Sequence, residues 1–479
     1  MDAQDDIEKM KALISNINSE LREVKDELNL VKAENLELKA ENKALKLEVK
    51  DLRAQLKQNS KNSHKPPSTD IIKAALPRKK GGKRGGKDGH EGNTLKMVAH
   101  ADKYEIDRPK ECIVCGHSLE GLKSRLSDEE RQVFDIVLQP MAVTSYKYEI
   151  VKCNCGALNH GKFPAYATQS AQYGPNIKAF WTVLNNECRL PFKKIQQLTY
   201  DIFEQDVNIA TVLNSSDQCY KRLAEVENHI KSRVSQTSLA HFDETGVRTA
   251  AKNYWVHVAS TKSYTYLFGH ENRGRKAIGD GEVSVLPDFK GRAVHDSWST
   301  YFSFDCEHAL CNAHILRELK GAEERGSKWA VKMHDLLMDL YLASEQGDAV
   351  VSGYDDWVEQ FVQICLEGEK EEPPAQKNKK GKPKRTKSRN LLERLIKYQN
   401  EVLAFAKYEE VPFTNNLAER DIRNIKIKTK VATSFRTYKG LKIYTRIQSF
   451  ISTLKKQNLN VFSNLKAIFE ANFDLASFK

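Results

Sequence analysis

The sequence lacks any continuous apolar run of about 18 residues, the length that a membrane-spanning helix requires. Its N-terminal residues also lack the compact apolar segment of a secretory signal peptide. Cysteine is sparse and odd in number, nine in 479 residues, which excludes a disulfide framework. Together these absences predict a soluble protein of the reducing cytoplasm.

Acidic residues are too few to balance the basic ones. The chain has 64 Asp and Glu against 76 Lys and Arg, a formal net charge of +12. A basic balance favours polyanionic partners, because Lys and Arg that bind phosphates release counterions. A basic protein without such a partner is the alternative. At roughly 100–200 residues per domain, the length predicts about two to four domains.

Residues 1–58 carry a seven-residue apolar repeat. Its two series are Ile7, Ile14, Leu21, Leu28, Asn35, Asn42, Val49 and Leu56, and Met10, Ile17, Val24, Val31, Leu38, Leu45 and Leu52. A repeat of this length predicts a coiled coil that joins two or more copies of the chain. The two asparagines favour a parallel dimer, because a polar residue at a core position fixes the register. A single long helix packed on its own body is the alternative.

Residues 59–99 break this pattern, first with prolines and then with glycines among cations. The cations are Arg78, Lys79, Lys80, Lys83, Arg84 and Lys87. Such a segment predicts a flexible basic arm that follows a DNA backbone. A solvated linker explains it equally well.

Residues 100–170 contain two close pairs of cysteines among β-rich stretches. The pairs are Cys112 with Cys115 and Cys153 with Cys155, and a glycine directly follows each pair. Two such pairs, distant from each other, favour a tetrahedral structural zinc site on two tight turns. One residue rather than two separates the second pair, and unliganded thiols are the alternative.

Residues 171–235 have the apolar spacing of helices. Two amphipathic segments, PFKKIQQLTYDIFEQ and NIATVLNSSDQCYKRL, flank a short break at 206–207 and resemble a helix-turn-helix. We interpret this region as helical and as a candidate DNA-binding region. Two helices that only pack together are the alternative.

The periodicity changes from residue 237, where short β-rich runs separated by turn-sized gaps begin. The runs SLAHFDETGVR, NYWVHVAST and SYTYLFGH predict an antiparallel three-stranded meander. A helix around RKAIGDGEV, a fourth strand at GRAVHDSW, a short helical segment and a fifth strand at EHALCNA follow. This order predicts an α/β, ribonuclease H-like core over residues 236–317 that residues 406–450 complete.

Three acids fall where such a core holds metal. Asp243 lies in the first strand, Asp296 ends the fourth, and Glu419 follows the helix-capping pair Asn415-Asn416. Neighbouring strands would bring the two aspartates to one edge of the sheet. Three carboxylates can hold two divalent ions for an in-line displacement at phosphorus, and hard oxygen ligands favour Mg²⁺ or Mn²⁺. For any single acid, a solvated surface side chain is the alternative.

A row of cations accompanies Glu419 on the predicted helix. The cations are Arg420, Arg423, Lys426 and Lys430. The last three share a face with Glu419 at spacings of three and four, which suits the binding of DNA phosphate beside a metal. Ala418, Ile422 and Ile425 form an adjacent apolar stripe. The later alternation IKIKTK leaves a strand at Lys430 as an alternative.

Several motifs in combination make the chain resemble transposases of the insertion-sequence-sixty-six family. They are NSHKPPSTD, HFDETGVR, AVHDSWSTYF, LCNAHILREL and FTNNLAERDIRNIKIKTKVATSF, and the similarity covers nearly the whole chain. The resemblance implies a DDE transposase that cleaves DNA at transposon ends and transfers the strands into target DNA. It implies Asp243, Asp296 and Glu419 as the catalytic, metal-binding triad, and a zinc-binding N-terminal domain.

An insertion separates the second acid from the third. Residues 318–405 include the low-complexity stretch EGEKEEPPAQKNKKGKPKRTKSRN and otherwise predict helices, as do the C-terminal residues 451–479. Just before the insertion, Cys311 and His314 have the spacing of half a metal site. We favour a strand-to-helix junction near the active edge, with His314 as an auxiliary contact to phosphate or water.

The expected partners are double-stranded DNA (transposon terminal repeats and target), further copies of the chain, and accessory proteins encoded by the element. DNA binding would associate this cytoplasmic protein with the nucleoid. Two other functions stay open: a ribonuclease H-like nuclease or resolvase, and a DNA-binding regulator with a silent core. A strand-joining assay tests the first, and metal-dependent cleavage tests the second.

Removal of residues 1–60 should lower the oligomeric state, because the heptads would hold the subunits together. Light scattering on the full-length and truncated proteins measures this. We expect a dimer or larger assembly for the full chain and a smaller assembly for the truncated one. Equal monomer masses for both proteins would contradict the coiled coil.

Overall fold

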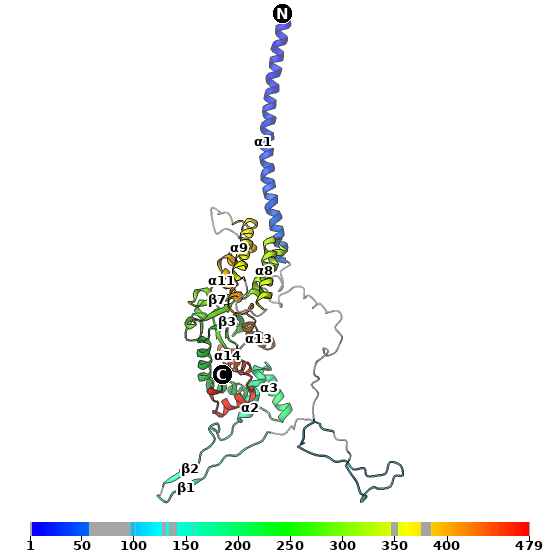
Figure 1. Ribbon diagram of the computed structural model, residues 1–479, viewed down its shortest axis with the longest axis vertical. Helices are drawn as coiled ribbons and strands as arrows, with labels where there is room; N and C mark the ends of the chain where they lie inside the picture. Colours follow the sequence, from blue (N-terminus) through cyan, green and yellow to red (C-terminus); the bar gives the residue numbers. More distant parts are fainter. Residues whose placement is uncertain are drawn as a thin grey trace. The chain divides into compact units, whose positions relative to one another are not determined.

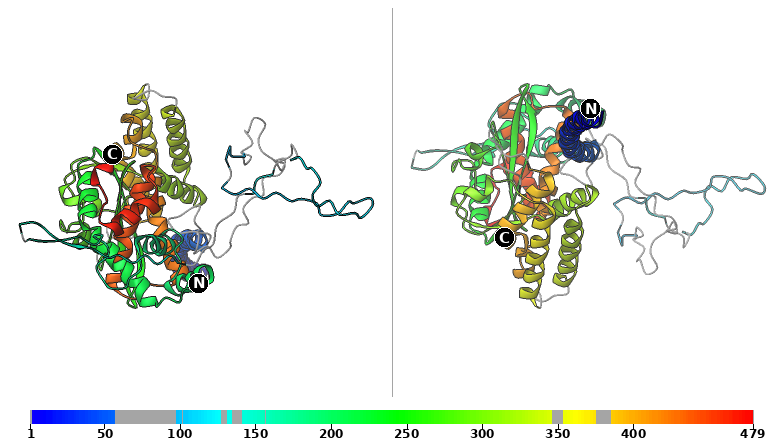
Figure 2. Two further views of the ribbon diagram at one scale, coloured as in Figure 1. Left: turned by 90° about the horizontal axis from the view of Figure 1, so that it is seen from below. Right: turned by 90° about the horizontal axis from the view of Figure 1, so that it is seen from above.

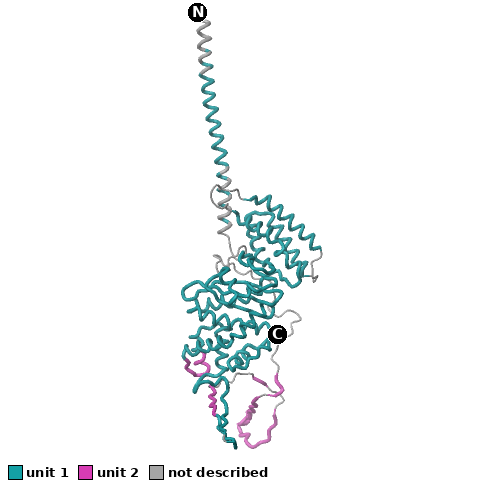
Figure 3. The backbone as a smooth tube through the Cα atoms, turned by 90° about the vertical axis from the view of Figure 1, so that its left-hand side faces the viewer, with its two compact units in different colours: residues 1–73, 148–196, 208–479 teal, residues 74–147, 197–207 magenta. Residues whose placement is uncertain are grey.

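The computed structural model describes residues 2–56, 97–100, 102–126, 131–133, 141–155, 157–345, 353–374 and 385–478. The chain divides into two compact units (Figure 3). One comprises residues 1–73, 148–196 and 208–479, and the other comprises residues 74–147 and 197–207. Residues 59–96 of the predicted basic arm, with its six cations from Arg78 to Lys87, lie outside the described residues. Within the described ranges, every helix is too short or too polar to span a bilayer.

The N-terminal helix α1 runs without a break from Asp2 to Leu56 (Figure 1). The heptad side chains that the structure describes are exposed, with Leu21 at 60% and Val24 at 62% of their full accessible area. The predicted helix is therefore present. The exposed apolar seam is the surface that a coiled coil would cover, and the pairing itself stays a prediction.

Four helices precede the central sheet, in the region where the apolar spacing predicts helices. They are α2 (Pro175–Asn186), α3 (Phe192–Phe203), α4 (Ile209–Arg222) and α5 (Ala224–Ser235). The break before α4 ends at Asn208, whose side chain accepts a hydrogen bond from the backbone N–H of Ala210. This cap satisfies one of the donors that a helix start leaves free, and it fixes where α4 begins.

A five-stranded mixed sheet forms the centre of the larger unit. Its strands are β3 (Leu239–Thr249), β4 (Lys252–Ser260), β5 (Thr265–His270), β6 (Arg292–His295) and β7 (Glu307–Leu310), in the spatial order β5-β4-β3-β6-β7. The first three pair antiparallel, as the meander predicts, whereas β6 pairs parallel with β3 and β7 parallel with β6. All five predicted strands are therefore present.

The connections within this sheet contain less helix than the sequence predicts. The helix expected around RKAIGDGEV is the single turn α6 (Arg275–Ile278), and a 3₁₀ turn (Leu286–Asp288) follows it. The helical segment expected between β6 and β7 is only the 3₁₀ turn Tyr301–Ser303. The glycines at 279 and 281 disfavour a longer helix in the first connection, and residues 296–306 are too few to add a full helix to the second.

Helices cover both faces of the sheet (Figure 2). One core joins side chains of the strands, including Phe242 and Phe268, to α5, to α14 (Tyr438–Lys456) and to α15 (Val461–Glu470). Another core joins Val256 and Val258, among others, to α13 (Asn416–Ala432). Consecutive residues of β4 and β5 are therefore buried on both faces of the sheet.

The insertion after β7 is helical and has its own core. Its elements are α7 (Asn312–Glu324), α8 (Lys328–Ser344), α9 (Tyr354–Glu371), α10 (Lys387–Lys397), α11 (Gln399–Val402) and α12 (Ala404–Lys407). Trp329, Phe361 and Leu392 are buried there together with Ala309 and Leu310 of β7. The core of the insertion is thus continuous with the outer parallel strand. Residues 375–384 of the low-complexity stretch lie outside the described residues.

Candidate functional site

Asp243 and Asp296 lie at the same level on neighbouring parallel strands. The last register pair of β3 and β6 is His241 with Val294, and each aspartate comes two residues after its member of that pair. Gly291 precedes β6 and permits this pairing, because a Cβ there would collide with the carbonyl oxygens of Thr237 and Ser238. Parallel strands place residues that follow a register pair at the same sheet edge.

Glu419 lies in the first turn of α13, and Asn415 connects that turn to β3. Asn415 occupies the N-cap position, but its side chain makes no capping bond, contrary to the prediction. Its Oδ1 accepts a hydrogen bond from His241 Nδ1 at 2.9 Å, and its Nδ2 donates to the carbonyl of Phe242 at 2.8 Å. The buried amide thus holds the start of α13 against β3, one residue from Asp243. Burial lowers the pKa of His241 to about 4, so its ring is neutral near pH 7.

The three acids interact electrostatically. Burial raises the pKa of Asp243 to about 8, and the charges of Glu244, Asp296 and Glu419 add to this rise. The hydrogen bond from the backbone N–H of Glu244 works in the opposite direction but is outweighed. The side chains that the sequence selected as a triad therefore lie close enough to repel each other in a poorly solvated place.

Glu244 is a fourth carboxylate at this edge that the sequence analysis missed. It accepts hydrogen bonds from Tyr301 Oη at 2.6 Å and from Arg273 Nη2 at 2.7 Å. The Arg273 guanidinium also lies over the rings of Trp255 and Trp298, 5.0 and 4.5 Å from their centroids. Burial raises the pKa of Glu244, but its partners offset part of that effect. Only the adjacency of Glu244 to Asp243 could have indicated it, because its partners come from distant loops.

A buried aromatic and histidine cluster supports Asp296. His295, at the end of β6, stacks on Tyr301 with ring centroids 4.6 Å apart, and its Nε2 lies 3.0 Å from His308 Nδ1. Asp296 Oδ1 accepts a hydrogen bond from the backbone N–H of Trp298 at 2.9 Å. The carboxylate is thus oriented by the loop that follows it.

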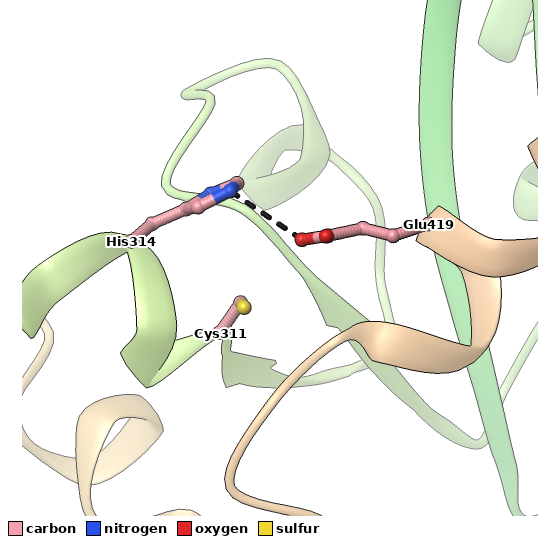
Figure 4. A group of neighbouring side chains, drawn as sticks. All are labelled: Cys311, His314 and Glu419. Carbon is pink, nitrogen blue, oxygen red and sulfur yellow. Dashed lines mark ion pairs between the residues drawn. The ribbon is translucent and has the colours of Figure 1, made fainter. Parts of the chain in front are cut away.

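Cys311 and His314 lie at the junction of β7 with α7, as predicted, and both face Glu419 (Figure 4). His314 Nε2 is 3.4 Å from Glu419 Oε1. The possible ligand atoms of Cys311, His314 and Glu419 all lie within 4.8 Å of one another. Burial raises the pKa of the Cys311 thiol to about 11, and its Sγ accepts a hydrogen bond from the backbone N–H of Asn415 at 3.1 Å. His314 therefore lies beside one of the predicted catalytic acids.

The predicted cationic face of α13 is exposed. Its members are Arg420, Arg423, Lys426 and Lys430, and the helix continues to Ala432, so Lys430 is helical rather than in a strand. Ala418, Ile422 and Ile425 are buried, as the apolar stripe predicts. Lys428 is different, because its Nζ is buried and donates to backbone carbonyls, including those of Asn185 and Leu190. Lys428 is therefore not available to bind DNA.

The two cysteine pairs each lie on a tight turn. Around the first pair, Cys112 N–H donates to the carbonyl of His117 and Gly116 has a φ of 72°. The second pair follows β1 (Ile150–Lys152), which pairs antiparallel with β2 (Leu158–His160). Hydrogen bonds from the backbone and side chain of the partner cysteine lower the pKa of Cys112 and of Cys153. Each turn therefore favours a thiolate, the form that binds metal.

Comparison with protein families identifies the chain. The model of the Transposase IS66 family matches residues 170–443, more than half of the sequence, and the chain belongs to this family. Membership assigns it a transposase role and DNA as its partner. A family of unknown function (DUF6444) matches residues 9–96. No curated protein matches the sequence.

Substitution Asn415→Ala should destabilise the fold by about 1–3 kcal/mol, because it leaves the carbonyl of Phe242 and Nδ1 of His241 without this partner. Transposition should fall further than the loss of folded protein explains, since Glu419 loses its connection to β3. Urea denaturation and a transposition assay measure the two effects. Asn416→Ala, at the exposed neighbouring position, is the control, and equal results for both variants would refute the role of Asn415.

Proposed function

We propose that this chain is a DDE transposase that cleaves DNA at transposon ends and transfers the cut strands into target DNA. Asp243, Asp296 and Glu419 are its catalytic acids. The observation that carries the proposal is geometric: Asp243 and Asp296 each come two residues after the same register pair of β3 and β6, and Asn415 holds the first turn of α13, which contains Glu419, against β3. Membership in the transposase family supports it independently.

The proposed fold of the catalytic domain is ribonuclease H-like. Three antiparallel strands followed by two parallel ones, in the order β5-β4-β3-β6-β7, support this assignment. So does a helix after the insertion that brings a third acid back to the first strand. In a fold of this kind, the parallel pair of strands aligns two acids, and the returning helix supplies the third.

The three acids fit divalent cations. Asp243 is deeply buried and three neighbouring acids raise its pKa, so the backbone N–H of Glu244 compensates its negative charge only in part. Oxygen ligands of this kind favour Mg²⁺ or Mn²⁺. Two such ions, when bound, would activate the attacking hydroxyl and stabilise the leaving oxygen in a displacement at phosphorus.

The remaining residues of the site position the acids and the DNA. Asn415 fixes the start of α13 on β3, and His314 orients Glu419 through their 3.4 Å contact. Arg423, Lys426 and Lys430 continue from Glu419 along one face of the helix, and with the exposed Arg420 they would bind the phosphates on either side of the reacting one. Positioning of this kind and electrostatic stabilisation account for most of the catalysis of phosphoryl transfer.

The same proposal includes two features of the N-terminal half. The exposed seam of α1 would pair with that of a second copy, so that two subunits hold two transposon ends. The thiolate-favouring turns at Cys112–Cys115 and Cys153–Cys155 would bind one structural Zn²⁺.

A nuclease or resolvase with the same acids is the second candidate, and a silent DNA-binding regulator is the third. A nuclease would cut the element ends without joining them to target DNA. A regulator would bind the ends and leave them uncut in Mg²⁺ or Mn²⁺. Strand-transfer assays on the element ends distinguish all three.

Neutralising any one acid should abolish cleavage and strand transfer, by at least about 100-fold, with the fold and end binding retained. The variants are Asp243→Asn, Asp296→Asn and Glu419→Gln, which keep side-chain size but remove one negative charge from the metal-binding set. Binding should stay equal or become slightly tighter, with steep salt dependence, because cations govern it. Asp305→Asn, an exposed acid between β6 and β7, is the control. Full strand transfer by any one triad variant in Mg²⁺ would remove that residue from the site.

The zinc proposal predicts about one tightly held Zn²⁺ per chain after dialysis against metal-free buffer. Cys112→Ser and Cys153→Ser should each lose it, because a three-thiolate site binds more weakly. Elemental analysis of the full-length proteins measures the metal, and Cys188→Ser, which removes an exposed thiol outside both pairs, is the control. Folded wild-type protein without zinc would rule the site out.

A further inference from the structure

A group of softer ligands lies directly beside the proposed catalytic acids. We propose that Cys311, His314 and Glu419 form a second metal site, selective for Zn²⁺, through which zinc inhibits the enzyme. The binding part of this inference stands on the geometry of the three side chains alone. The inhibition rests on the proposed function, because it requires Glu419 to be a catalytic acid.

The spacing of the three ligand atoms fits one ion. All of them lie within 4.8 Å of one another, and His314 Nε2 is 3.4 Å from Glu419 Oε1. Tetrahedral zinc with bonds of about 2.0–2.3 Å separates its ligand atoms by about 3.4–3.8 Å. The imidazole and the carboxylate are therefore already at the required distance, and the thiol needs a shift of about 1 Å at most.

The site is assembled from two helix starts. Cys311 is the N-cap of α7, His314 lies in the first turn of that helix, and Glu419 lies in the first turn of α13 (Figure 4). The backbone N–H of Asn415 donates to Cys311 Sγ, the type of outer hydrogen bond that stabilises a metal-bound thiolate. Asn415 also fixes α13 on β3, so the distance between the two helix starts is set by the fold.

The three side chains differ in their exposure to solvent. Cys311 is 1% exposed, whereas the side chains of His314 and Glu419 keep 19% and 31% of their accessible area. Parts of the His314 and Glu419 side chains therefore reach the surface, whereas the Cys311 thiol is buried. Three protein ligands leave a fourth position for water, as in sites that exchange their metal or bind substrate.

The ligand types of this site favour a different metal from the proposed catalytic site at Asp243 and Asp296. A thiolate and an imidazole favour zinc over magnesium, whereas carboxylates alone favour magnesium or manganese. Glu419 belongs to both sets of ligands. Its carboxylate cannot bind zinc and the catalytic ions equally well at the same time. Zinc bound to Cys311 and His314 would therefore draw Glu419 away from Asp243 and Asp296.

Cobalt(II), a spectroscopic substitute for zinc, tests binding directly. Titration of zinc-loaded full-length protein should produce a thiolate-to-cobalt absorption band in the near ultraviolet, as cobalt enters the weaker site while the cysteine turns keep their zinc. Cys311→Ser should lose this band, and His314→Gln should weaken cobalt binding at least tenfold. Cys365→Ser, which also removes a buried thiol, should retain the band. A band of unchanged intensity in folded Cys311→Ser would overturn the site.

Zinc inhibition tests the functional part. In excess Mg²⁺, added Zn²⁺ should inhibit strand transfer by the wild type, and His314→Gln should require at least tenfold more zinc for the same fractional inhibition. Inhibition that is equally sensitive in wild type and His314→Gln would overturn the regulatory role. If Glu419→Gln retains strand transfer, the catalytic assignment fails, while the cobalt band of the wild type still decides the metal site.

Discussion

The geometry of the site depends on the side chain of one buried residue, Asn415. Its amide bonds both His241 and the carbonyl of Phe242 in β3, and its backbone N–H bonds Cys311. The side chain of an N-cap residue ordinarily accepts a hydrogen bond from a backbone N–H in the first turn of its own helix. Here the side chain joins the start of α13 to β3, and the backbone N–H adds Cys311 at the start of α7. The distance between Asp243 and Glu419 follows from the connection to β3. The insertion does not disturb it, because its core is continuous with β7.

Two adjacent carboxylates of β3 have opposite environments. Glu244 bonds Arg273 and Tyr301, so its charge has direct partners. Asp243 is buried among further acids, and its pKa rises to about 8. Because this folded-state pKa exceeds the usual value of 3.8 for an aspartate, ionisation of Asp243 destabilises the fold. The penalty is absent below about pH 4 and complete above about pH 8. With a pKa of about 8, Asp243 is mostly protonated at pH 7, and a bound dication would favour its ionised form, as expected for the proposed metal ligand.

Much of the fold could be predicted from short-range patterns. Short β-rich runs separated by turn-sized gaps located the strands, and three- and four-residue spacing located α4 and the buried stripe of α13. The sequence patterns failed where contacts with distant segments determine the partners of a side chain. The capping role of Asn415 was wrong because β3 offers its side chain better partners than its own helix does. Glu244 was missed because Arg273 and Tyr301 reach it from other loops. The position of Lys430 in a helix also required the structure, since IKIKTK suits a strand or a helix equally.

The direction in which Glu419 points is set by buried polar groups on the same helix. Asp421 accepts hydrogen bonds from Ser260 and Thr265 and forms an ion pair with Lys456 at 2.7 Å. Lys428, two turns further on, donates to carbonyls at the end of α2 and just beyond it. Burial lowers the pKa of Lys428 to about 8, so this contact is held against a desolvation penalty.

An apolar stripe alone would tolerate some rotation of α13 about its axis, because hydrophobic contacts are not directional. Hydrogen-bonded charges tolerate far less, since a buried charge without its partner is strongly destabilising. Asp421 and Lys428 therefore lock the rotation at two points along the helix. With the rotation fixed, Glu419 must face His314 and the acids, and the exposed cations must face away from the core. The sequence of α13 thus determines both the position of an acid and the direction of the proposed DNA-binding surface.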